Sequence, residues 1–557
     1  VLVFGTDEQV ELMSAQVCTI GVGQGDRFVC ENDSRYQVRS ANEHDLNRLI
    51  SELVEKQKMP QQILFLWTTQ NSEQPEKIGI NSLLGLVKAL VAIRGEAPVS
   101  LRVVTQQQVA ITDEQVKLPE YATLSGFVKA LAQEHTQWSV RVVDISDAGV
   151  KEHLQQLVAE LAGLSQEYEV VLRQQRWVSR LVQVDYRNEK TQAGPVIEEG
   201  LYLITGGLGG IGLEVARFLQ NEYRTKLLLV GRTPFENLDQ EKRDRFAQLR
   251  HKTAVVYECV DITDKESLDK CIKKHESQHN CQLKGVFHLA GVAMEKMVAE
   301  LTVDEIEKVI APKVSGTKAL HEILVRRGGG LCVNFSSVNG FFGGMTTAAY
   351  SAANSFIDAF TVWQNSQGVN AYVIGWSMWQ EIGISRSYAD HVKALSRARG
   401  YIPIAVDRGI ASLKIILSHQ YQEVLVGLEK GCWHIDSYLL ETAAIRNYLE
   451  AYVAGHEGIL SQLQNVEVGD CYGTPTTASL VAVTEIPKDS DGHVDLEKLQ
   501  TEFGGKQKAV KTLAPRNELE TQIWSIWQEA LGVTEFGIRD NFFQLGGHSL
   551  LATQVVS

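Results

Sequence analysis

The sequence predicts an α/β protein made of two parallel-sheet halves, followed by a small α+β segment and a final helical segment. Three observations predict this fold. Strand-like and helical patterns alternate over residues 1–190, a glycine-rich turn joins a strand to a helix at 201–220, and the alternation then continues to about residue 435. Past that residue the pattern changes, and a last helical pattern starts near Ala514.

The bulk composition excludes several classes of protein. The chain has 557 residues, 44% of them hydrophobic, and its net charge of −14 disfavours nucleic acid or an anionic membrane as a general partner. Its eight cysteines lack metal-ligand spacing, so we expect no metal site and reduced thiols in a cytoplasmic protein. No apolar run is long enough to span a membrane. Residue 1 is Val and the last residues stop inside a helical pattern, so we expect a piece of a longer protein.

The first half reads as βαβ units without a phosphate site. Strand-like stretches alternate with helical ones at 61–69, 80–93, 99–106, 123–135 and 138–146. The first strand leads into its helix with no glycine fingerprint. The glycines of the run GVGQGDRF at 21–28 are followed by more strand, so a hairpin turn is expected there. One strand over 168–186 should close this half, and the polar stretch 187–200 reads as a linker.

The second half carries a dinucleotide-binding pattern. In LITGGLGGIGLEVARFL, glycines 206, 210 and 212 let the turn tighten and the backbone approach a pyrophosphate, which the helix N-terminus attracts. Five or six apolar strands alternate with helices from here to about residue 435, which predicts a doubly wound sheet. The residues predicted to bind the cofactor are Thr205, Gly206, Gly207, Gly209, Gly210, Ile211, Gly212, Arg232, Asp261, Ala290 and Gly291.

Two residues at strand ends bear on which cofactor binds. Arg232 can pair with a 2′-phosphate, where an acidic residue would select NAD, so NADPH is favoured. A solvated arginine is the alternative. Asp261 could accept a hydrogen bond from the adenine amino group or could instead cap a helix.

The stretch NFSSVNGFFGGMTTAAYSAANSF at 334–356 suggests proton-transfer chemistry. It sets Ser337 thirteen residues before Tyr350 and places Asn354 one helical turn beyond Tyr350. A carbonyl accepts a hydride more easily when its oxygen is protonated. Tyrosine titrates near 10, so a cation is needed to stabilise the phenolate, and Lys313 in VIAPKVSGTKAL is the candidate. The alternative is small-residue packing where a strand meets a helix.

These residues resemble the short-chain dehydrogenase/reductase superfamily, through TGGLGGIG, FSS, Tyr350 and AAN. Plain members carry lysine four residues after the tyrosine, where this chain has Asn354. In this chain the lysine lies instead in the upstream PKVSG segment, and this placement resembles that in the ketoreductase domains of modular polyketide and nonribosomal peptide synthetases. The resemblance implies Tyr350, Ser337, Lys313 and Asn354 as the catalytic set. It also implies two Rossmann-like halves, a truncated, cofactor-free structural one at 1–190 and a catalytic, NADPH-binding one at 191–435.

The chain departs from that family at positions that carry stereochemical signatures. Where many members have LDD this chain has Ala293, Met294 and Glu295, and where others have tryptophan eight residues before the tyrosine it has Phe342. The product configuration therefore cannot be read. The GWSMW stretch resembles the segment beside the cofactor, with Trp379 either lining the substrate cavity or packing, and residues 380–403 are expected to form a lid.

The C-terminal sequence DNFFQLGGHSLLATQVV resembles a phosphopantetheine attachment site. The resemblance implies Ser549 as the acceptor of 4′-phosphopantetheine, in the N-terminal part of a carrier domain at 513–557, with ELETQIWSIWQEALG as its first helix. Segment 436–512 resembles the C-terminal subdomain of adenylation domains, but His493 and Leu496 replace the lysine and arginine of the usual ending. We expect a degenerate spacer, with an unrelated linker as the alternative.

Together these resemblances imply a ketoreductase of a depsipeptide-making nonribosomal synthetase. It would use NADPH to reduce a carrier-bound α-ketoacyl thioester. Its expected partners are neighbouring adenylation and condensation domains and a phosphopantetheinyl transferase. A polyketide β-ketoacyl reductase is the alternative, with the same catalytic residues. A noncatalytic docking scaffold is a weaker one, since a scaffold has no need for these spacings.

Overall fold

The computed structural model describes residues 1–69, 75–95, 97–111, 114–163, 167–184, 186, 193–250, 254–440, 449–454, 467–469, 475–483, 521 and 524–528. The chain divides into two compact units. The first contains residues 1–179 and 185–436, and the second contains residues 180–184 and 437–557. Each is described below by itself.

The N-terminal half of the first unit is a nine-stranded sheet in the order β3-β4-β2-β1-β5-β6-β7-β8-β9. All neighbouring strands run parallel except the outermost pairs β3–β4 and β8–β9. The strands are β1 Leu2–Phe4, β2 Ile20–Gln24, β3 Val29–Asn32, β4 Arg35–Val38, β5 Gln62–Phe65, β6 Ser100–Gln106, β7 Ser139–Ile145, β8 Glu169–Leu172 and β9 Arg176–Trp177. The helices are α1 Asp7–Ser14, α2 Glu43–Glu55, α3 Pro75–Arg94, α4 Ala122–Glu134, α5 Gly149–Glu152 and α6 Leu154–Ala162.

Two local predictions for this half are wrong. The glycines at 21 and 23 do not form a hairpin turn, because they lie within β2, which pairs in parallel with β1 and β4. A β-carbon on Gly21 would lie 2.4 Å from Val10 Cγ1, so the glycine serves close packing of α1 on the sheet. The hairpin instead joins β3 to β4. Likewise, residues 168–186 are not one strand, since β8 turns back into β9.

The C-terminal half of the first unit, which the sequence predicts to be the catalytic half, is a seven-stranded, all-parallel sheet in the order β12-β11-β10-β13-β14-β15-β16. This order reverses between β10 and β13, which confirms the doubly wound prediction and adds a seventh strand that the sequence pattern did not reveal. The strands are β10 Leu201–Thr205, β11 Lys226–Gly231, β12 Val255–Cys259, β13 Leu283–His288, β14 Leu331–Ser337, β15 Asn370–Trp376 and β16 Glu423–Val426.

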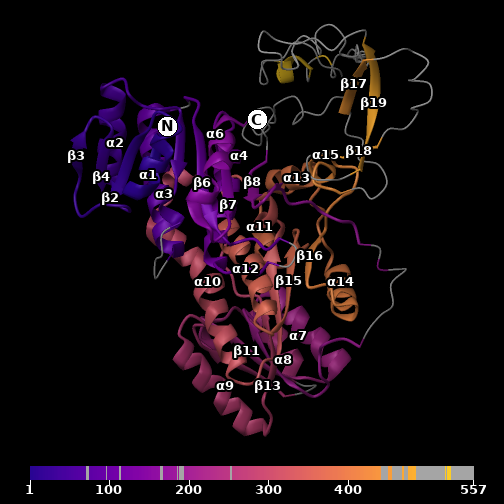
Figure 1. Cartoon of the computed structure of the whole chain (residues 1–557). Coiled ribbons are helices and arrows are strands. Elements are labelled where there is room, and N and C mark those ends of the chain that lie inside the picture. The colour runs from indigo at the N-terminus through magenta and orange to yellow at the C-terminus, as the bar shows by residue number, and fades with distance from the viewer. Residues whose placement is uncertain are drawn as a thin grey trace. The chain divides into compact units, whose positions relative to one another are not determined.

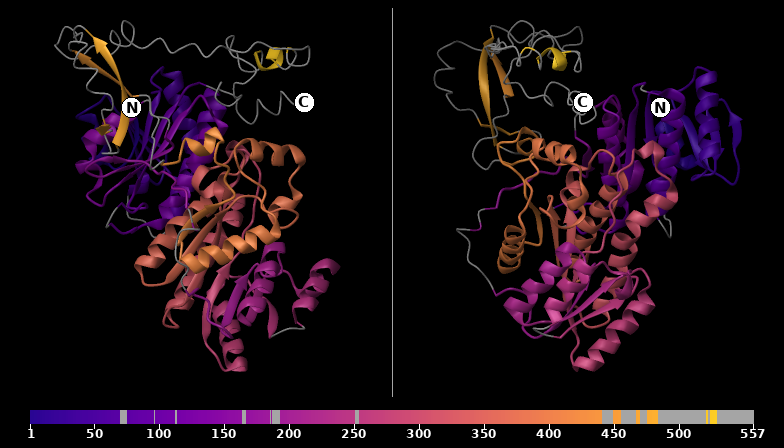
Figure 2. Two further views of the ribbon diagram at one scale, coloured as in Figure 1. Left: turned by 90° about the vertical axis from the view of Figure 1, so that its right-hand side faces the viewer. Right: turned by 180° about the vertical axis from the view of Figure 1, so that it is seen from behind.

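Helices cover both faces of this sheet (Figures 1 and 2). Side chains of α7, α8 and α14 share one core with the sheet, and those of α9 and the C-terminal part of α10 share another. The helices are α7 Gly210–Tyr223, α8 Gln240–Arg250, α9 Lys265–His279, α10 Val303–Val325, α11 Val338–Phe342, α12 Ala348–Ser366, α13 Asp390–Ala398, α14 Val406–His419 and α15 Trp433–Asp436.

The two halves share one hydrophobic core. Leu124, Phe127 and Leu131 of α4 belong to the same buried cluster as Ala352 and Phe356 of α12. The helices meet where the purple and salmon ribbons adjoin in Figure 1. Gly126 makes this contact close, because a β-carbon there would lie 2.2 Å from the Ser351 carbonyl oxygen. The helix that carries Tyr350 therefore packs backbone to backbone on the half that lacks a glycine-rich turn.

The second unit contains a small sheet in the order β17-β19-β18, formed by β17 Leu449–Ala454, β18 Glu467–Gly469 and β19 Pro475–Val483. β19 pairs in parallel with β17 and antiparallel with β18. Residues 521 and 524–528, within the predicted first carrier helix, are helical. His493, Leu496 and Ser549 lie outside the described residues. Among the helices that are described, none is both long and apolar enough to cross a membrane.

Candidate active site

Three neighbouring strands end at the candidate site. The predicted residues Thr205 and Ser337 end β10 and β14, and His288, which sequence reasoning did not single out, ends β13 between them, at the point where the strand order reverses. In open α/β sheets, this edge and this reversal form the crevice that binds ligands.

The glycine-rich turn after β10 has the shape that a pyrophosphate requires. Gly206 has φ +65°, a conformation that favours glycine, and a β-carbon on it would lie 3.2 Å from Ala290 Cα. A β-carbon on Gly212 would lie 2.5 Å from the Gly206 carbonyl oxygen, so only glycine lets α7 start this close to the turn. Gly209 is the N-cap of α7, whose N-terminus therefore faces the turn. These residues fit a dinucleotide.

The Thr205 hydroxyl forms hydrogen bonds within the protein at the edge of the crevice. Its Oγ1 accepts hydrogen bonds from the backbone N–H groups of Leu289 and Ala290 at 3.1 and 3.0 Å, and it lies 2.7 Å from His288 Nδ1. Burial lowers the pKa of His288 to about 3, so this imidazole is neutral. The hydroxyl thus fixes the turn at Ala290 and Gly291, opposite the glycine-rich turn.

The two predicted nucleotide-reading residues are both exposed. Arg232 follows β11, and no ion pair joins its guanidinium to another residue in the described parts of the chain, so it can meet a phosphate. Asp261 accepts hydrogen bonds from the Thr263 backbone N–H at 2.9 Å and the Thr263 hydroxyl at 2.8 Å. The helix-cap alternative for Asp261 is wrong, because Asp264 caps α9.

Ser337, Tyr350 and Asn354 come together as the spacing predicts. Ser337 caps α11, its Oγ accepting from the Asn339 backbone N–H at 3.2 Å, while Tyr350 and Asn354 lie one turn apart on α12. Burial raises the pKa of Tyr350, and nearby Ser337 and Asn354 partly offset this by hydrogen bonding. The phenol therefore holds its proton at neutral pH, as a proton donor must.

Lys313 is buried beside this group but bonds elsewhere. Its Nζ donates to the Phe335 carbonyl oxygen at 2.5 Å, and no other hydrogen bond from this amine is found among the described residues. Burial lowers the pKa of Lys313 to about 8, which the Asp358 carboxylate partly offsets. Burial likewise raises the pKa of Asp358 to about 7. The sequence did not single out Asp358, although it lies two turns beyond Tyr350 on α12.

The substrate side contains one residue that sequence reasoning missed. Tyr388, in the predicted lid, lies close enough to Tyr350 and Glu295 for both to add to the rise in its pKa that burial causes. Trp379 is a packing residue, since it is buried and its ring occupies the space where a Gly409 β-carbon would be, 2.3 Å away. Phe342 is also buried, against Tyr401 and His434.

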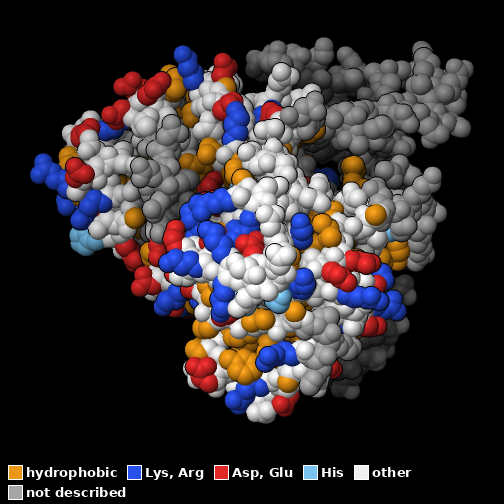
Figure 3. Space-filling model, turned by 90° about the horizontal axis from the view of Figure 1, so that it is seen from below, with side chains coloured by type: hydrophobic (Ala, Val, Ile, Leu, Met, Phe, Trp, Pro, Cys, Tyr) orange, Lys and Arg blue, Asp and Glu red, His pale blue; other side chains and the backbone are white. Residues whose placement is uncertain are grey.

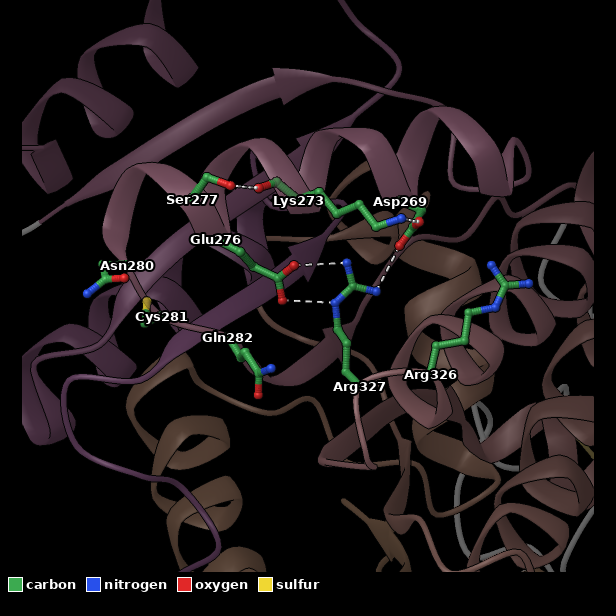
Figure 4. A pocket seen from close by; sticks show the side chains of 9 residues that line it. All are labelled: Asp269, Lys273, Glu276, Ser277, Asn280, Cys281, Gln282, Arg326 and Arg327. Atoms are coloured by element: carbon green, nitrogen blue, oxygen red, sulfur yellow. Dashed lines mark hydrogen bonds and ion pairs between the residues drawn. The ribbon is translucent and has the colours of Figure 1, made fainter.

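A hollow of about 690 Å³ lies away from this crevice, between α9 and the C-terminal end of α10. Figure 4 shows Arg327 at its centre, paired with Glu276 at 2.9 Å and Asp269 at 2.8 Å. Gln282, which precedes β13, also lines the hollow, so the hollow lies at the amino-terminal edge of the sheet. These ion pairs join α9 to the end of α10, and we assign them a structural role.

The surface shown in Figure 3 carries basic side chains next to acidic ones.

One group among the described residues could hold a metal ion, formed by Glu258, Cys271 and His275. The Glu258 carboxylate is already engaged, by Lys274 at 2.7 Å and His275 at 2.8 Å. Burial raises the pKa of the Cys271 thiol to about 11, which disfavours the thiolate that a metal would need. The group is best explained as a charge cluster that joins β12 to α9.

Three family models match the chain. Residues 200–381 match the KR domain, residues 1–162 match a model described as beta-ketoacyl synthase-like, N-terminal, and residues 521–557 match the phosphopantetheine attachment site. Residues 200–381, within the half that carries the glycine-rich turn, are therefore a KR domain. This confirms the ketoreductase and carrier resemblances. The KR match makes this domain an oxidoreductase and implies NADPH as its cofactor, and the attachment-site match implies 4′-phosphopantetheine as the group carried by residues 521–557.

The curated relatives of the KR domain are much longer proteins. The chain is 30% identical over 344 residues to one component of the phenolphthiocerol/phthiocerol polyketide synthase of Mycobacterium tuberculosis, which covers 60% of this chain and 18% of the relative. It is 30% identical over 351 residues to erythronolide synthase EryA3 of Saccharopolyspora erythraea, covering 62% of this chain and 10% of the relative. The chain therefore spans less than a fifth of either length.

Solved structures agree with the fold. An "Adenylation, ketoreductase, and pseudo Asub multidomain structure of a keto acid-selecting NRPS module" is 26% identical with a TM-score of 0.74, covering 90% of this chain and 44% of that one. A C2-type ketoreductase from a modular polyketide synthase is 21% identical with a TM-score of 0.66, covering 78% of this chain and 93% of that one. The second likeness concerns the fold alone.

Proposed function

We propose that this KR domain reduces a carrier-bound α-ketoacyl thioester to the α-hydroxyacyl thioester within a depsipeptide-making nonribosomal synthetase. The observation that carries this proposal is the likeness, over 90% of the chain, to a keto acid-selecting NRPS module that contains a ketoreductase and a pseudo Asub. That likeness covers 90% of the chain and so extends past the KR domain at 200–381, whereas a polyketide ketoreductase of similar fold covers 78% of the chain. The sheet of β17, β18 and β19 lies in segment 436–512, which we assign to the degenerate adenylation-like spacer.

In this proposal Tyr350 is the general acid. When bound, NADPH supplies a hydride to the ketone carbon, and the Tyr350 O–H gives its proton to the ketone oxygen, so that a hydroxyl forms. Ser337 holds that oxygen and stabilises the phenolate left behind, since its hydrogen bond already offsets part of the rise in the pKa of Tyr350 that burial causes. Asn354 Nδ2 donates to the Tyr350 carbonyl oxygen at 2.8 Å, and its Oδ1 accepts from no group of the described protein. A water can satisfy Oδ1 and return a proton to the tyrosine.

Lys313 acts on this site as a buried cation rather than as a direct partner of the phenol. Its amine is held on the Phe335 carbonyl, two residues before Ser337 on β14. Gly291 allows the lysine side chain to pass, because a β-carbon there would lie 3.2 Å from Lys313 Cε. A positive charge at this depth favours a phenolate nearby. The role that the sequence assigned to Lys313 stays a prediction, with the Phe335 carbonyl as an added anchor.

The glycine-rich turn, Arg232 and the Ala290–Gly291 turn would hold NADPH. Ser549 would carry the substrate as a thioester of phosphopantetheine, attached by a phosphopantetheinyl transferase. Adenylation and condensation domains would lie elsewhere in the longer protein. A second candidate, reduction of a polyketide β-ketoacyl thioester, is favoured by the two polyketide synthases at 30% identity.

One assay separates the two candidates. Matched α-ketoacyl and β-ketoacyl thioesters are offered with NADPH, and the loss of NADPH absorbance is followed. Preferential consumption of the α-keto thioester supports the proposal, and preference for the β-keto thioester overturns it. Mass spectrometry after treatment with coenzyme A and a transferase should show phosphopantetheine on the wild-type chain and none on Ser549→Ala.

A further inference from the structure

We propose that Glu134, in the half without a cofactor site, is a positioning residue for the reduction. It is the last residue of α4 and reaches into the catalytic half. Its Oε2 accepts from the Val298 backbone N–H at 2.7 Å and its Oε1 from the Thr346 backbone N–H at 3.0 Å. One carboxylate thereby holds two separate loops. This inference rests on the proposed ketone reduction.

The two loops that Glu134 holds border the active site on both sides. The first follows β13, starts at the Ala290–Gly291 turn and ends at Val298. The second joins α11 to α12 and leads directly to the turn of α12 that carries Tyr350. The Lys296 backbone N–H also donates to the Thr346 carbonyl oxygen at 2.7 Å, so the loops are bonded to each other. Their spacing sets the gap in which a ketone must meet the phenol.

Thr346 needs such support. Its φ is +63°, a left-handed conformation that is unfavourable for a β-branched residue. Such residues persist only where the surroundings over-determine them. The Glu134 carboxylate fixes the Thr346 N–H and the Lys296 N–H fixes its carbonyl, so both backbone polar groups of this residue are held.

The neighbouring Gln133 extends the same clamp. Its Nε2 donates to the Phe342 carbonyl oxygen at 2.7 Å, where the second loop begins. Its Oε1 accepts from Arg399 at 2.9 Å, at the end of the lid helix α13. The C-terminal turn of α4 therefore contacts the loops before and after the crevice and the lid. The end of α13 and the segment that leads to α12 therefore share one support.

The position of the Glu134 carboxylate is unfavourable for stability, which favours a functional role. A carboxylate at the C-terminal end of a helix meets the negative end of the helix dipole. Glu134 forms no ion pair with any basic side chain in the described part of the chain, and burial raises its pKa to about 7. A buried carboxylate that opposes the helix dipole and lacks a cationic partner is expected mainly at a functional or strained site. Here the Glu134 carboxylate binds two backbone N–H groups of the catalytic half.

The test compares Glu134→Gln with Asp45→Asn in the full chain. Asp45 is the control, because it is a buried carboxylate on α2 of the same half that accepts the Arg39 backbone N–H at 3.1 Å and the Arg39 guanidinium at 2.9 Å, and it contacts neither loop that Glu134 holds. Glu134→Gln puts an amide N–H₂ opposite one backbone donor. We expect kcat with the ketoacyl thioester to fall by about tenfold or more, with KM for NADPH unchanged. Asp45→Asn should lower thermal stability while kcat per folded molecule stays at the wild-type value.

Amide hydrogen exchange supplies a readout that does not need turnover. Peptides covering Val298 and Thr346 should exchange faster in Glu134→Gln and unchanged in Asp45→Asn. Unchanged exchange and kcat in Glu134→Gln, or a kcat loss that only follows the folded fraction, would overturn the proposal. If Glu134→Gln does not fold, Glu134→Asp, which is too short to reach both donors, replaces it. If the wild type reduces neither thioester, the proposed function fails, and exchange alone then decides the role of Glu134.

Discussion

The contact between α4 and α12 allows one substitution to test how tightly the two halves position Tyr350. In Gly126→Ala, the added β-carbon would lie 2.2 Å from the Ser351 carbonyl oxygen and 2.6 Å from the Ala352 backbone nitrogen. A carbon and an oxygen normally approach to about 3.4 Å, so the helices must separate by roughly 1 Å. Both obstacles are backbone atoms, which cannot rotate away.

We expect Gly126→Ala to lower the stability of the folded protein, although helix propensity alone would raise it. Glycine to alanine within a helix ordinarily stabilises by about 1 kcal/mol, whereas overpacking a core costs about 1–3 kcal/mol. A shift of about 1 Å at the residue next to Tyr350 can reduce kcat by up to about 100-fold. NADPH binding should be unchanged, because the glycine-rich turn lies on α7 and β10, away from this contact.

The assay measures kcat, NADPH affinity and thermal unfolding for Gly126→Ala and for Gly23→Ala. Gly23 lies in β2 of the same half, and a β-carbon there would meet its nearest atoms at 3.9 Å, an ordinary contact. Gly23→Ala should therefore behave like the wild type. A Gly126→Ala protein with wild-type stability and wild-type kcat would refute the idea that this packing sets the position of the catalytic helix.

Three further predictions concern the site itself. Tyr350→Phe should lower kcat by about 10²–10⁴-fold with NADPH still bound, as loss of a general acid does, and appreciable turnover would contradict that role. Activity should fall as pH rises through about 8, the pKa to which burial lowers Lys313, because the cation is present only below it. Asp358→Asn removes the charge that partly offsets this shift, so the alkaline limb of the pH–rate profile should move to lower pH; an unmoved limb would exclude Lys313 as the titrating group. Arg232→Ala should raise KM for NADPH by about tenfold or more, given about 1.5–3 kcal/mol for a charged hydrogen bond, and leave KM for NADH unchanged; equal effects would mean that Arg232 does not contact the phosphate.

Local spacing in the sequence was enough to predict several parts of the site. The strand, glycine turn and helix at 201–220 appear where the pattern placed them, since Gly206 takes a positive φ and Gly212 lies against the Gly206 carbonyl within the turn itself. Tyr350 and Asn354 share one face of α12 because residues four apart always do so on a helix. Ser337 reaches the same edge because it ends a parallel strand.

Only the tertiary structure decided which partners the buried charges take. Lys313 bonds to the carbonyl of Phe335, and the Asp358 carboxylate partly offsets the fall in its pKa, two partners that spacing along the chain did not indicate. Glu134 reaches backbone donors 164 and 212 residues away in sequence. The glycines of β2 suggested a turn in the sequence, whereas the structure places them in a strand on which α1 packs closely at Gly21. Periodicity and spacing reflect the geometry of a single element, whereas these contacts depend on how separate elements pack, which no local pattern records.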